Sequence, residues 1–388
     1  MKQEINFDYN ASAGLLPQVR TALFDIDLGL NPSSVHRGGQ RSRALIENSR
    51  DEILCALGSN EDYELVFTSG ATESNNTAML SQFWDTAADR STDEVVTLAV
   101  EHPSVLEPLR RLVRKGHKVH FVNPSSATWL EELLDRITER TALVSIMIAN
   151  NETGRVFDLA AILPLVRARN PKVVIHSDLV QALGKMPINL ATLDLDLASI
   201  SGHKIGALSG TGALIVRRST ELHPLIVGGS QELKRRAGTE NVMGIVSFGL
   251  AATFVTQSLV NRISRMSKYR DFVENSLLDT VSDVQILDRN QRRIANTSCL
   301  RIPGVMADDL IVALDLEGIQ ASSGAACSSG KPEPSHVLMS LGLNAREAKE
   351  CLRISVDPSL DMEGVELACQ KISESIMRFR SNLRVGNA

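Results

Sequence analysis

The sequence predicts an α/β protein in which a mostly parallel β-sheet with helices on both faces is followed by a smaller α+β domain. Short runs rich in Val, Ile and Leu alternate with helical segments between about residues 64 and 218, an order typical of parallel strands joined by helices. The chain has 388 residues, enough for two domains. Its hydrophobic pattern also changes after about residue 244, where a second domain should follow.

Seven apolar segments are the expected strands of the large sheet, at 64–67, 94–99, 118–122, 142–148, 173–175, 195–199 and 211–217. The segments between them, such as 129–137 and 159–166, repeat apolar residues with the helical period of about 3.6. A long helix over about 244–276 should then connect the domains, and strands are expected in 351–355 and from Arg301. We therefore expect a large domain over 14–258 and a small domain formed by 259–388 together with 1–13.

Composition restricts the partners and the compartment. Hydrophobic residues make up 43% and charged residues 22% of the chain, as in ordinary globular proteins. The net charge is 41 − 46 = −5, so the chain has no overall basic field to hold a nucleic acid. The odd number of cysteines and the absence of a C-x-x-C pair argue against a disulfide framework and a zinc site; they are Cys55, Cys299, Cys327, Cys351 and Cys369. With no signal-like start and no apolar run of about 18 residues, the sequence favours a cytoplasmic protein.

The segment 67–73 leaves a strand through small residues and enters a helix. Gly70, Ala71 and Thr72 would present free backbone N–H groups at the helix start, which suits a phosphate. The alternative is an ordinary turn with a threonine cap. No Gly-Lys-Ser/Thr follows, and 210–212 lacks the third glycine of a dinucleotide fingerprint, so both nucleotide-binding interpretations are weakened.

Polar residues also follow two later strands. Asp178 follows the 173–175 strand, and Ser201, His203 and Lys204 follow the next strand. A carboxylate for a pyridine nitrogen, a lysine for an aldehyde, and hydroxyl and imidazole donors for a phosphate are what pyridoxal 5'-phosphate requires. A structural Asp–Lys ion pair is the alternative.

Two further residues fit the same cofactor. Gln181, three residues after Asp178, is expected near the ring hydroxyl. His102 follows another strand and could stack on the ring, although a lone histidine there is more often a helix-entry or surface residue.

Several motifs together resemble the cysteine desulfurases of the class V aminotransferase family, and they cover nearly the whole chain in order. They are Thr68-Ser-Gly-Ala-Thr-Glu-Ser-Asn75, Asn150-Asn-Glu-Thr-Gly154, His176-Ser-Asp-Leu-Val-Gln-Ala-Leu-Gly-Lys185, Ser201-Gly-His-Lys204, Arg236-Ala-Gly-Thr-Glu-Asn241 and Ser322-Ser-Gly-Ala-Ala-Cys-Ser-Ser-Gly330. The last motif looks like the cysteine-bearing loop of the iron–sulfur-cluster and nitrogenase-type group. The resemblance implies a fold-type I pyridoxal-phosphate enzyme.

The resemblance also implies an activity: L-cysteine is converted to L-alanine, and its sulfur is passed through an enzyme persulfide to an acceptor protein such as an iron–sulfur scaffold or a tRNA-thiolation carrier. Lys204 would bind the cofactor and shuttle protons, and Cys327, on a mobile loop at about 321–333, would attack the substrate sulfur. Asn151 and Arg353 would hold the substrate carboxylate. Thr239 would reach the phosphate of the partner subunit in a homodimer.

The residues themselves support the role of Cys327. It lies among Ser, Gly and Ala, which do not form a packed core element, whereas the other four cysteines lie in apolar or helical segments where Cys packs as a small hydrophobe. Arg353 alternates with apolar neighbours on a strand and offers a bidentate fork to a carboxylate; a salt bridge is its alternative.

The chain departs from the family pattern at 206–210, 228–234 and 356–358, which bears on substrate entry and rate. The alternative functions are a selenocysteine lyase or β-lyase, an aminotransferase, or a weakly active sulfur-relay protein.

Overall fold

The computed structural model describes residues 4–84, 94–324 and 333–385, with side chains through residue 381. The chain divides into two compact units. Unit 1 comprises Met1–Ala11, Ala149–Val156 and Val260–Ala388, and unit 2 comprises Ser12–Ile148 and Phe157–Leu259. The segment Ala149–Val156, inside the range expected for the large domain, thus groups with the carboxyl-terminal part of the chain.

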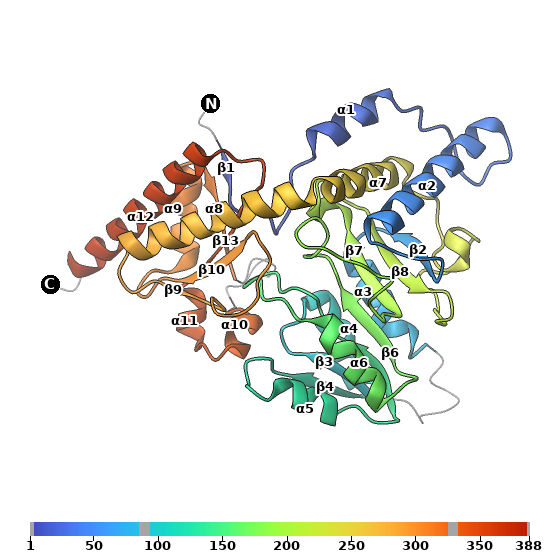
Figure 1. The fold of residues 1–388 in the computed structure, drawn as a ribbon, viewed down its shortest axis with the longest axis horizontal. Helices are drawn as coiled ribbons and strands as arrows, with labels where there is room; N and C mark the ends of the chain where they lie inside the picture. Colours follow the sequence, from blue (N-terminus) through green and yellow to red (C-terminus); the bar gives the residue numbers. More distant parts are fainter. Residues whose placement is uncertain (1–3, 85–93, 325–332, 386–388) are drawn as a thin grey trace. The chain divides into compact units, whose positions relative to one another are not determined.

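Unit 2 is built on a seven-stranded sheet in the order β2-β8-β7-β6-β5-β3-β4 (Figure 1). β8 is antiparallel to both neighbours, β2 and β7, and the remaining neighbours are parallel. The predicted α/β class with a mostly parallel sheet is therefore confirmed. The strands are β2 (Tyr63–Thr68), β3 (Glu94–Leu98), β4 (Lys118–Val122), β5 (Thr141–Ser145), β6 (Val174–Asp178), β7 (Leu197–Ser201) and β8 (Gly212–Arg217).

The helices of unit 2 have apolar residues at helical spacing. In α4, for example, Val105, Leu109 and Leu112 are buried at steps of four and three residues, as expected for a helix lying on a sheet. Pro103 at the first helical position of α4 fits because its missing N–H would have no partner in the helix. The helices are α1 (Pro17–Asp25), α2 (Arg37–Ala56), α3 (Ala71–Ser81), α4 (Pro103–Arg114), α5 (Trp129–Asp135), α6 (Leu159–Arg169) and α7 (Val242–Gln257), with short 3₁₀ turns η1 (Gly202–Lys204) and η2 (Glu232–Lys234).

The single long helix predicted over 244–276 is wrong. Two helices occupy the region, α7 and α8 (Leu259–Thr280), and Ser258 lies between them. The Ser258 hydroxyl donates to the Phe254 carbonyl (2.7 Å), so it satisfies a carbonyl at the end of α7. No single helix in the described part of the chain is long and apolar enough to cross a membrane, and only the bent pair α7 and α8 passes together, by length and composition.

Unit 1 contains an antiparallel sheet in the order β12-β13-β10-β9 and a parallel pair, β1 with β11. The predicted strand at 351–355 is confirmed as β13, whereas the strand expected from Arg301 is β10, which ends at that residue. The strands are β1 (Ile5–Asn6), β9 (Gln285–Ile286), β10 (Thr297–Arg301), β11 (Ile319–Gln320), β12 (Ser322–Ser323) and β13 (Cys351–Ser355); the helices after α8 are α9 (Ala307–Leu316), α10 (His336–Ser340), α11 (Ala345–Lys349) and α12 (Met362–Val385).

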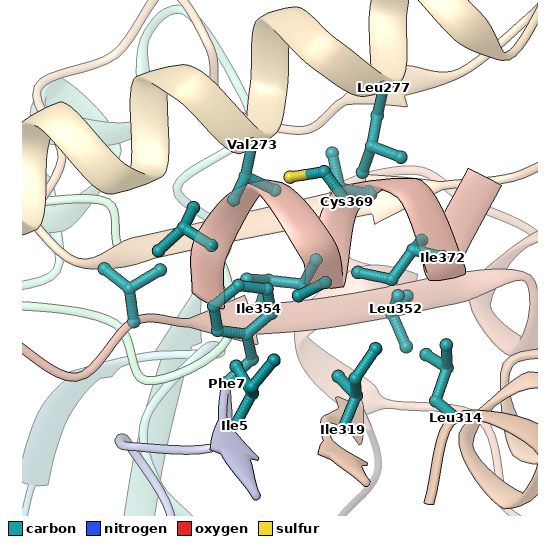
Figure 2. Close-up of a cluster of buried hydrophobic side chains, with 14 of the residues drawn as sticks. Ile5, Phe7, Val273, Leu277, Leu314, Ile319, Leu352, Ile354, Cys369 and Ile372 are labelled. Carbon is teal, nitrogen blue, oxygen red and sulfur yellow. The ribbon is translucent and has the colours of Figure 1, made fainter. Parts of the chain in front are cut away.

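A large apolar core lies in unit 1 (Figure 2). Leu352 and Ile354 of β13 contribute to it beside Phe7, Val273 of α8 and Ile372 of α12. Because alternate side chains of a strand point to opposite faces, Arg353 between them projects away from this core.

Candidate active site

Gly212 brings the proposed phosphate cradle to the edge where β7 ends. In the sheet, Gly212 lies opposite Thr68 at the end of β2 and opposite Ser201 at the end of β7. A Cβ at Gly212 would lie 2.6 Å from the Gly70 Cα and 2.8 Å from the Ala71 nitrogen, so only glycine lets this loop lie against β8. The sequence-predicted residues Gly70 to Thr72 and Ser201 therefore meet at one end of the sheet.

The start of α3 has the character of an anion cradle. Gly70 is its N-cap, and no side chain caps the helix by a hydrogen bond. A Cβ at Gly70 would meet no atom within 4 Å, so the space beside this residue is open. Together with the hydroxyl and imidazole of Ser201 and His203, this donor set fits a phosphate.

Asp178, at the end of β6, is buried and held by hydrogen bonds. Its Oδ2 accepts from Asn75 Nδ2 (2.8 Å), and its Oδ1 accepts from the Val180 N–H (2.9 Å). Within the described residues this carboxylate forms no ion pair with a lysine, so the alternative of a structural Asp178–Lys204 pair is not what the structure shows. A buried, oriented carboxylate is the group required beside a pyridine nitrogen.

A chain of hydrogen bonds joins Asp178 to His102. Asn75 also donates to the Ser104 Oγ (2.8 Å), which lies 2.7 Å from the His102 Nδ1. The Ser104 N–H donates to the same nitrogen (3.1 Å), so His102 is the N-cap of α4 and its Nδ1 is an acceptor. The helix-entry interpretation of His102 is thus correct, and it leaves the ring fixed in one orientation.

Ser201 is the last residue of β7, and His203 and Lys204 follow it in the short turn η1. The Ser201 Oγ lies 2.9 Å from the His203 Nδ1. Burial lowers the pKa of His203 to about 4, with smaller contributions from the positive charges of Lys204 and Lys185. His203 is consequently neutral at pH 7.

The two remaining predicted residues of unit 2 lie in different settings. Gln181 is buried in the turn after β6. Thr239 is exposed and, with Thr68, Ser69 and Arg236, lines a cavity of about 190 Å³. Its proposed reach to a partner subunit stays a prediction.

In unit 1, Arg353 has partners on two sides of its guanidinium. Its Nη2 lies 2.6 Å from the Asp8 Oδ1, and its Nη1 donates to the Asn151 carbonyl (3.3 Å). The Arg353 Nε is buried with no partner in the described part of the chain. Arg353 therefore forms a salt bridge with Asp8, and its bonds to Asp8 and Asn151 use only two of the five N–H donors of the guanidinium.

The Asn150–Gly154 motif is a turn that presents Asn151. The Asn150 Oδ1 accepts from the N–H groups of Glu152 (2.9 Å) and Thr153 (3.0 Å), and Gly154 has a φ of +79°. A Cβ at Gly154 would lie 2.9 Å from the Thr297 Cβ. Both the positive φ and this close approach therefore require glycine.

Glu152 within this turn is fully buried. Its Oε2 accepts from the Ser335 Oγ (2.6 Å), and a Cβ at Gly324 would lie 2.8 Å from the same oxygen. Burial raises the pKa of Glu152 to about 7, against the opposing effects of the Ser335 bond and the Arg353 charge.

Cys327, the predicted nucleophile, lies outside the described residues, as does most of the loop expected at about 321–333. Of the four cysteines expected to pack, Cys299, Cys351 and Cys369 are buried. The expectation is wrong for Cys55, which is exposed. It lies on α2, whose buried side is formed by residues such as Ile46 and Ile53, so an apolar neighbourhood in the sequence did not tell which face it occupies.

The sequence did not identify several residues that support the site. They are Asn75 and Ser104 beside Asp178, Asp8 beside Arg353, and the buried Glu152 and Lys185. Asn75, Glu152 and Lys185 lie inside the motifs that carry the family resemblance, and this is the one signal that pointed to them.

Comparisons with known proteins show the family to which the chain belongs. The aminotransferase class-V family matches residues 5–367. The curated cysteine desulfurase of Trichormus azollae is 37% identical over 382 residues, covering 97% of this chain and 94% of that protein. A solved NifS-like protein is 31% identical with a TM-score of 0.89 and covers 97% of this chain and 100% of that chain. A solved complex of SspA with cysteine is 27% identical with a TM-score of 0.76, covering 91% and 99% of the two chains.

The chain therefore belongs to the class V aminotransferase family. Within that family, the group it resembles over nearly its whole length is that of the cysteine desulfurases.

Proposed function

We propose that this protein is a pyridoxal-phosphate-dependent cysteine desulfurase that converts L-cysteine to L-alanine and retains the sulfur as a persulfide. The observation that carries the proposal is the set of polar groups at the ends of adjacent strands β6 and β7. There Asp178 and Ser201 end the two strands, and His203 and Lys204 follow β7. The uncapped start of α3 lies beside them through Gly212. The likeness to cysteine desulfurases supports the choice of substrate.

In this proposal the residues of unit 2 hold the cofactor. The N–H groups of Gly70 to Thr72, together with Ser201 and His203, bind the phosphate. Asp178, held by Asn75, would face the pyridine nitrogen and favour its protonated form, His102 would pack on the ring, and Lys204 would bind the aldehyde. Bound pyridoxal phosphate supplies an electron-withdrawing ring that acidifies the substrate α-carbon. Lys204 would then be the side chain that moves the substrate α-proton.

Unit 1 supplies the groups for the substrate carboxylate. Arg353, oriented by Asp8 and by the Asn151 carbonyl, offers the fork of donors, and Asn151 assists. A guanidinium that is already oriented loses little side-chain entropy on binding a carboxylate.

Cys327 performs the sulfur transfer in this proposal. Its thiolate attacks the sulfur of the substrate, a sulfur–sulfur bond forms, and the carbon–sulfur bond of the substrate breaks. The electron pair of the broken bond stays with the β-carbon, which takes up a proton and leaves as part of alanine. The outer sulfur of the persulfide then passes to a thiol of an acceptor protein. We place the enzyme in the cytoplasm as a homodimer in which Thr239 reaches the partner's cofactor.

The test uses Cys327→Ser with Cys55→Ser as the matched control, because Cys55 is the exposed cysteine of the described part of the chain. Purified variants are incubated with L-cysteine, alanine and sulfide are measured, and the persulfide is located by mass spectrometry. We expect Cys327→Ser to bind cysteine but form no persulfide, and Cys55→Ser to match wild type. Lys204→Ala should lose the visible absorption of the bound cofactor.

Other results would point to the alternatives. Undiminished sulfide release by Cys327→Ser would indicate a β-lyase or selenocysteine lyase. Consumption of an oxo acid without a persulfide would indicate an aminotransferase. Acceptor binding without alanine formation would indicate a sulfur-relay protein.

A further inference from the structure

Lys185 is a lysine with almost no exposure to solvent. It lies four residues after Gln181 in the turn that follows β6, and 1% of its surface is exposed. Lysine is almost never fully buried unless its charge is paired or hydrogen-bonded. The Lys185 Nζ donates to the Gln181 Oε1, so a positive charge is held at one side of this amide.

This bond decides how the Gln181 amide is oriented. An ammonium has three donors and no acceptor, so it can face the carbonyl oxygen of the amide and not its NH₂ group. With the oxygen directed at Lys185, the NH₂ group presents its two donors on the other branch of the amide. Gln181 is therefore fixed as a hydrogen-bond donor toward whatever else it faces.

The charge of Lys185 also reaches the cofactor-binding residues. After burial and the charge of Lys204, it is a further cause of the lowered pKa of His203. Other charged or titratable groups of this neighbourhood are Asp178 on β6, the buried Glu101 that interacts with it, and His203 and Lys204 on η1.

We propose that Lys185 is a positioning residue that makes Gln181 a donor to the ring hydroxyl oxygen of bound pyridoxal phosphate. This inference rests on the proposed function. A donor at that oxygen stabilises its deprotonated form, which lies next to the nitrogen that joins Lys204 to the cofactor. Losing the donor and the nearby positive charge should make that nitrogen easier to protonate.

The experiment compares wild type with Lys185→Met, full length and loaded with pyridoxal phosphate. The readouts, taken without substrate, are the Kd of the cofactor and the pH midpoint at which its visible absorption band changes. We expect the midpoint of Lys185→Met to rise by about 1 pH unit. Lys172→Met, at an exposed lysine just before β6, is the matched control and should leave the midpoint unchanged.

A double-mutant cycle with Gln181→Leu tests whether Lys185 acts through Gln181. If it does, Lys185→Met shifts the midpoint less in the Gln181→Leu background than in wild type. Lys185→Gln removes the charge but keeps a polar donor, so it replaces Lys185→Met in the same cycle should that variant fail to fold.

Two results overturn the inference while leaving the proposed function standing: a variant of Lys185 whose band titrates as in wild type, or shifts that simply add in the cycle. A wild-type chain that forms no visible band with pyridoxal phosphate overturns both.

Discussion

The Arg353 guanidinium is bound to the carboxylate of Asp8, whose Oδ1 lies 2.6 Å from the Arg353 Nη2. The two residues are 345 positions apart in the chain. Arg353 is almost fully buried, whereas the side chain of Asp8 is 28% exposed. Asp8 therefore compensates a buried positive charge and also fixes the direction of the donors that we assign to the substrate.

Asp8→Ala should destabilise the protein because it leaves this buried guanidinium without its charged partner. We expect a loss of about 2 kcal/mol in the free energy of unfolding, and a smaller loss for Asp8→Asn, which keeps an acceptor. Urea denaturation measures both. Asp27→Ala is the control, because its partner Arg41 is exposed and such pairs contribute about 0–1 kcal/mol. Equal losses at Asp8 and Asp27 would contradict the role of Asp8.

Gly212→Ala should weaken cofactor binding. The added Cβ would meet the Gly70 backbone at 2.6 Å, so the start of α3 must move away from Ser201. If overpacking of about 1–3 kcal/mol falls on the cofactor-binding state, the Kd for pyridoxal phosphate should rise about 5-fold to 150-fold. Gly14→Ala, where a Cβ meets nothing within 4 Å, is the control. Equilibrium dialysis that gave equal Kd values for both variants would show that the cradle tolerates displacement.

The sequence reveals those parts of the site that depend on position along one strand. Asp178 and Lys204 could be predicted because a polar residue at the end of an apolar strand is visible in the sequence. Asn75 could not be assigned to Asp178 in this way, because it lies on α3, 103 residues earlier, and their contact depends on how α3 packs on the sheet.

The dependence of contacts on packing between distant segments also explains the other features that the sequence did not predict. Gly212 acts through two strands at once, Asp8 reaches Arg353 from the opposite end of the chain, and the face of α2 on which Cys55 lies depends on packing. The break at Ser258 was missed because apolar spacing continues across it.

Lys234→Gly should stabilise the protein. Glu232, Leu233 and Lys234 have φ values of +44°, +58° and +65°, a left-handed backbone that non-glycine residues disfavour. Glu232 is held there because its carboxylate binds Arg50 and the Phe67 N–H. Glycine at 234 relieves strain while adding freedom to the unfolded chain, for a net gain of about 0.5–1 kcal/mol.

Lys115→Gly is the matched control for that change, because Lys115 follows α4 with a φ of −89° and has no such strain to relieve. It should be neutral or destabilising in the same urea experiment. A loss of stability in Lys234→Gly as large as in Lys115→Gly would show that the left-handed segment is not strained.

The buried carboxyl of Glu152 should make stability depend on pH. Its pKa is raised by burial from 4.5 to about 7, so the folded protein binds a proton more tightly than the unfolded chain does. The stabilisation is fully present below about pH 4.5 and is lost as the pH rises through about 7. A shift of this size corresponds to about 3 kcal/mol.

Glu152→Gln tests this, because glutamine stays neutral and can still accept from Ser335 through its carbonyl oxygen. The free energy of unfolding of Glu152→Gln minus that of wild type should grow between pH 5 and pH 8 by up to about 3 kcal/mol. Glu61→Gln, at an exposed position, is the control and should give a constant difference over this range. A constant difference for Glu152→Gln as well would mean that Glu152 keeps the same charge over this whole range, with Arg353 compensating a buried carboxylate.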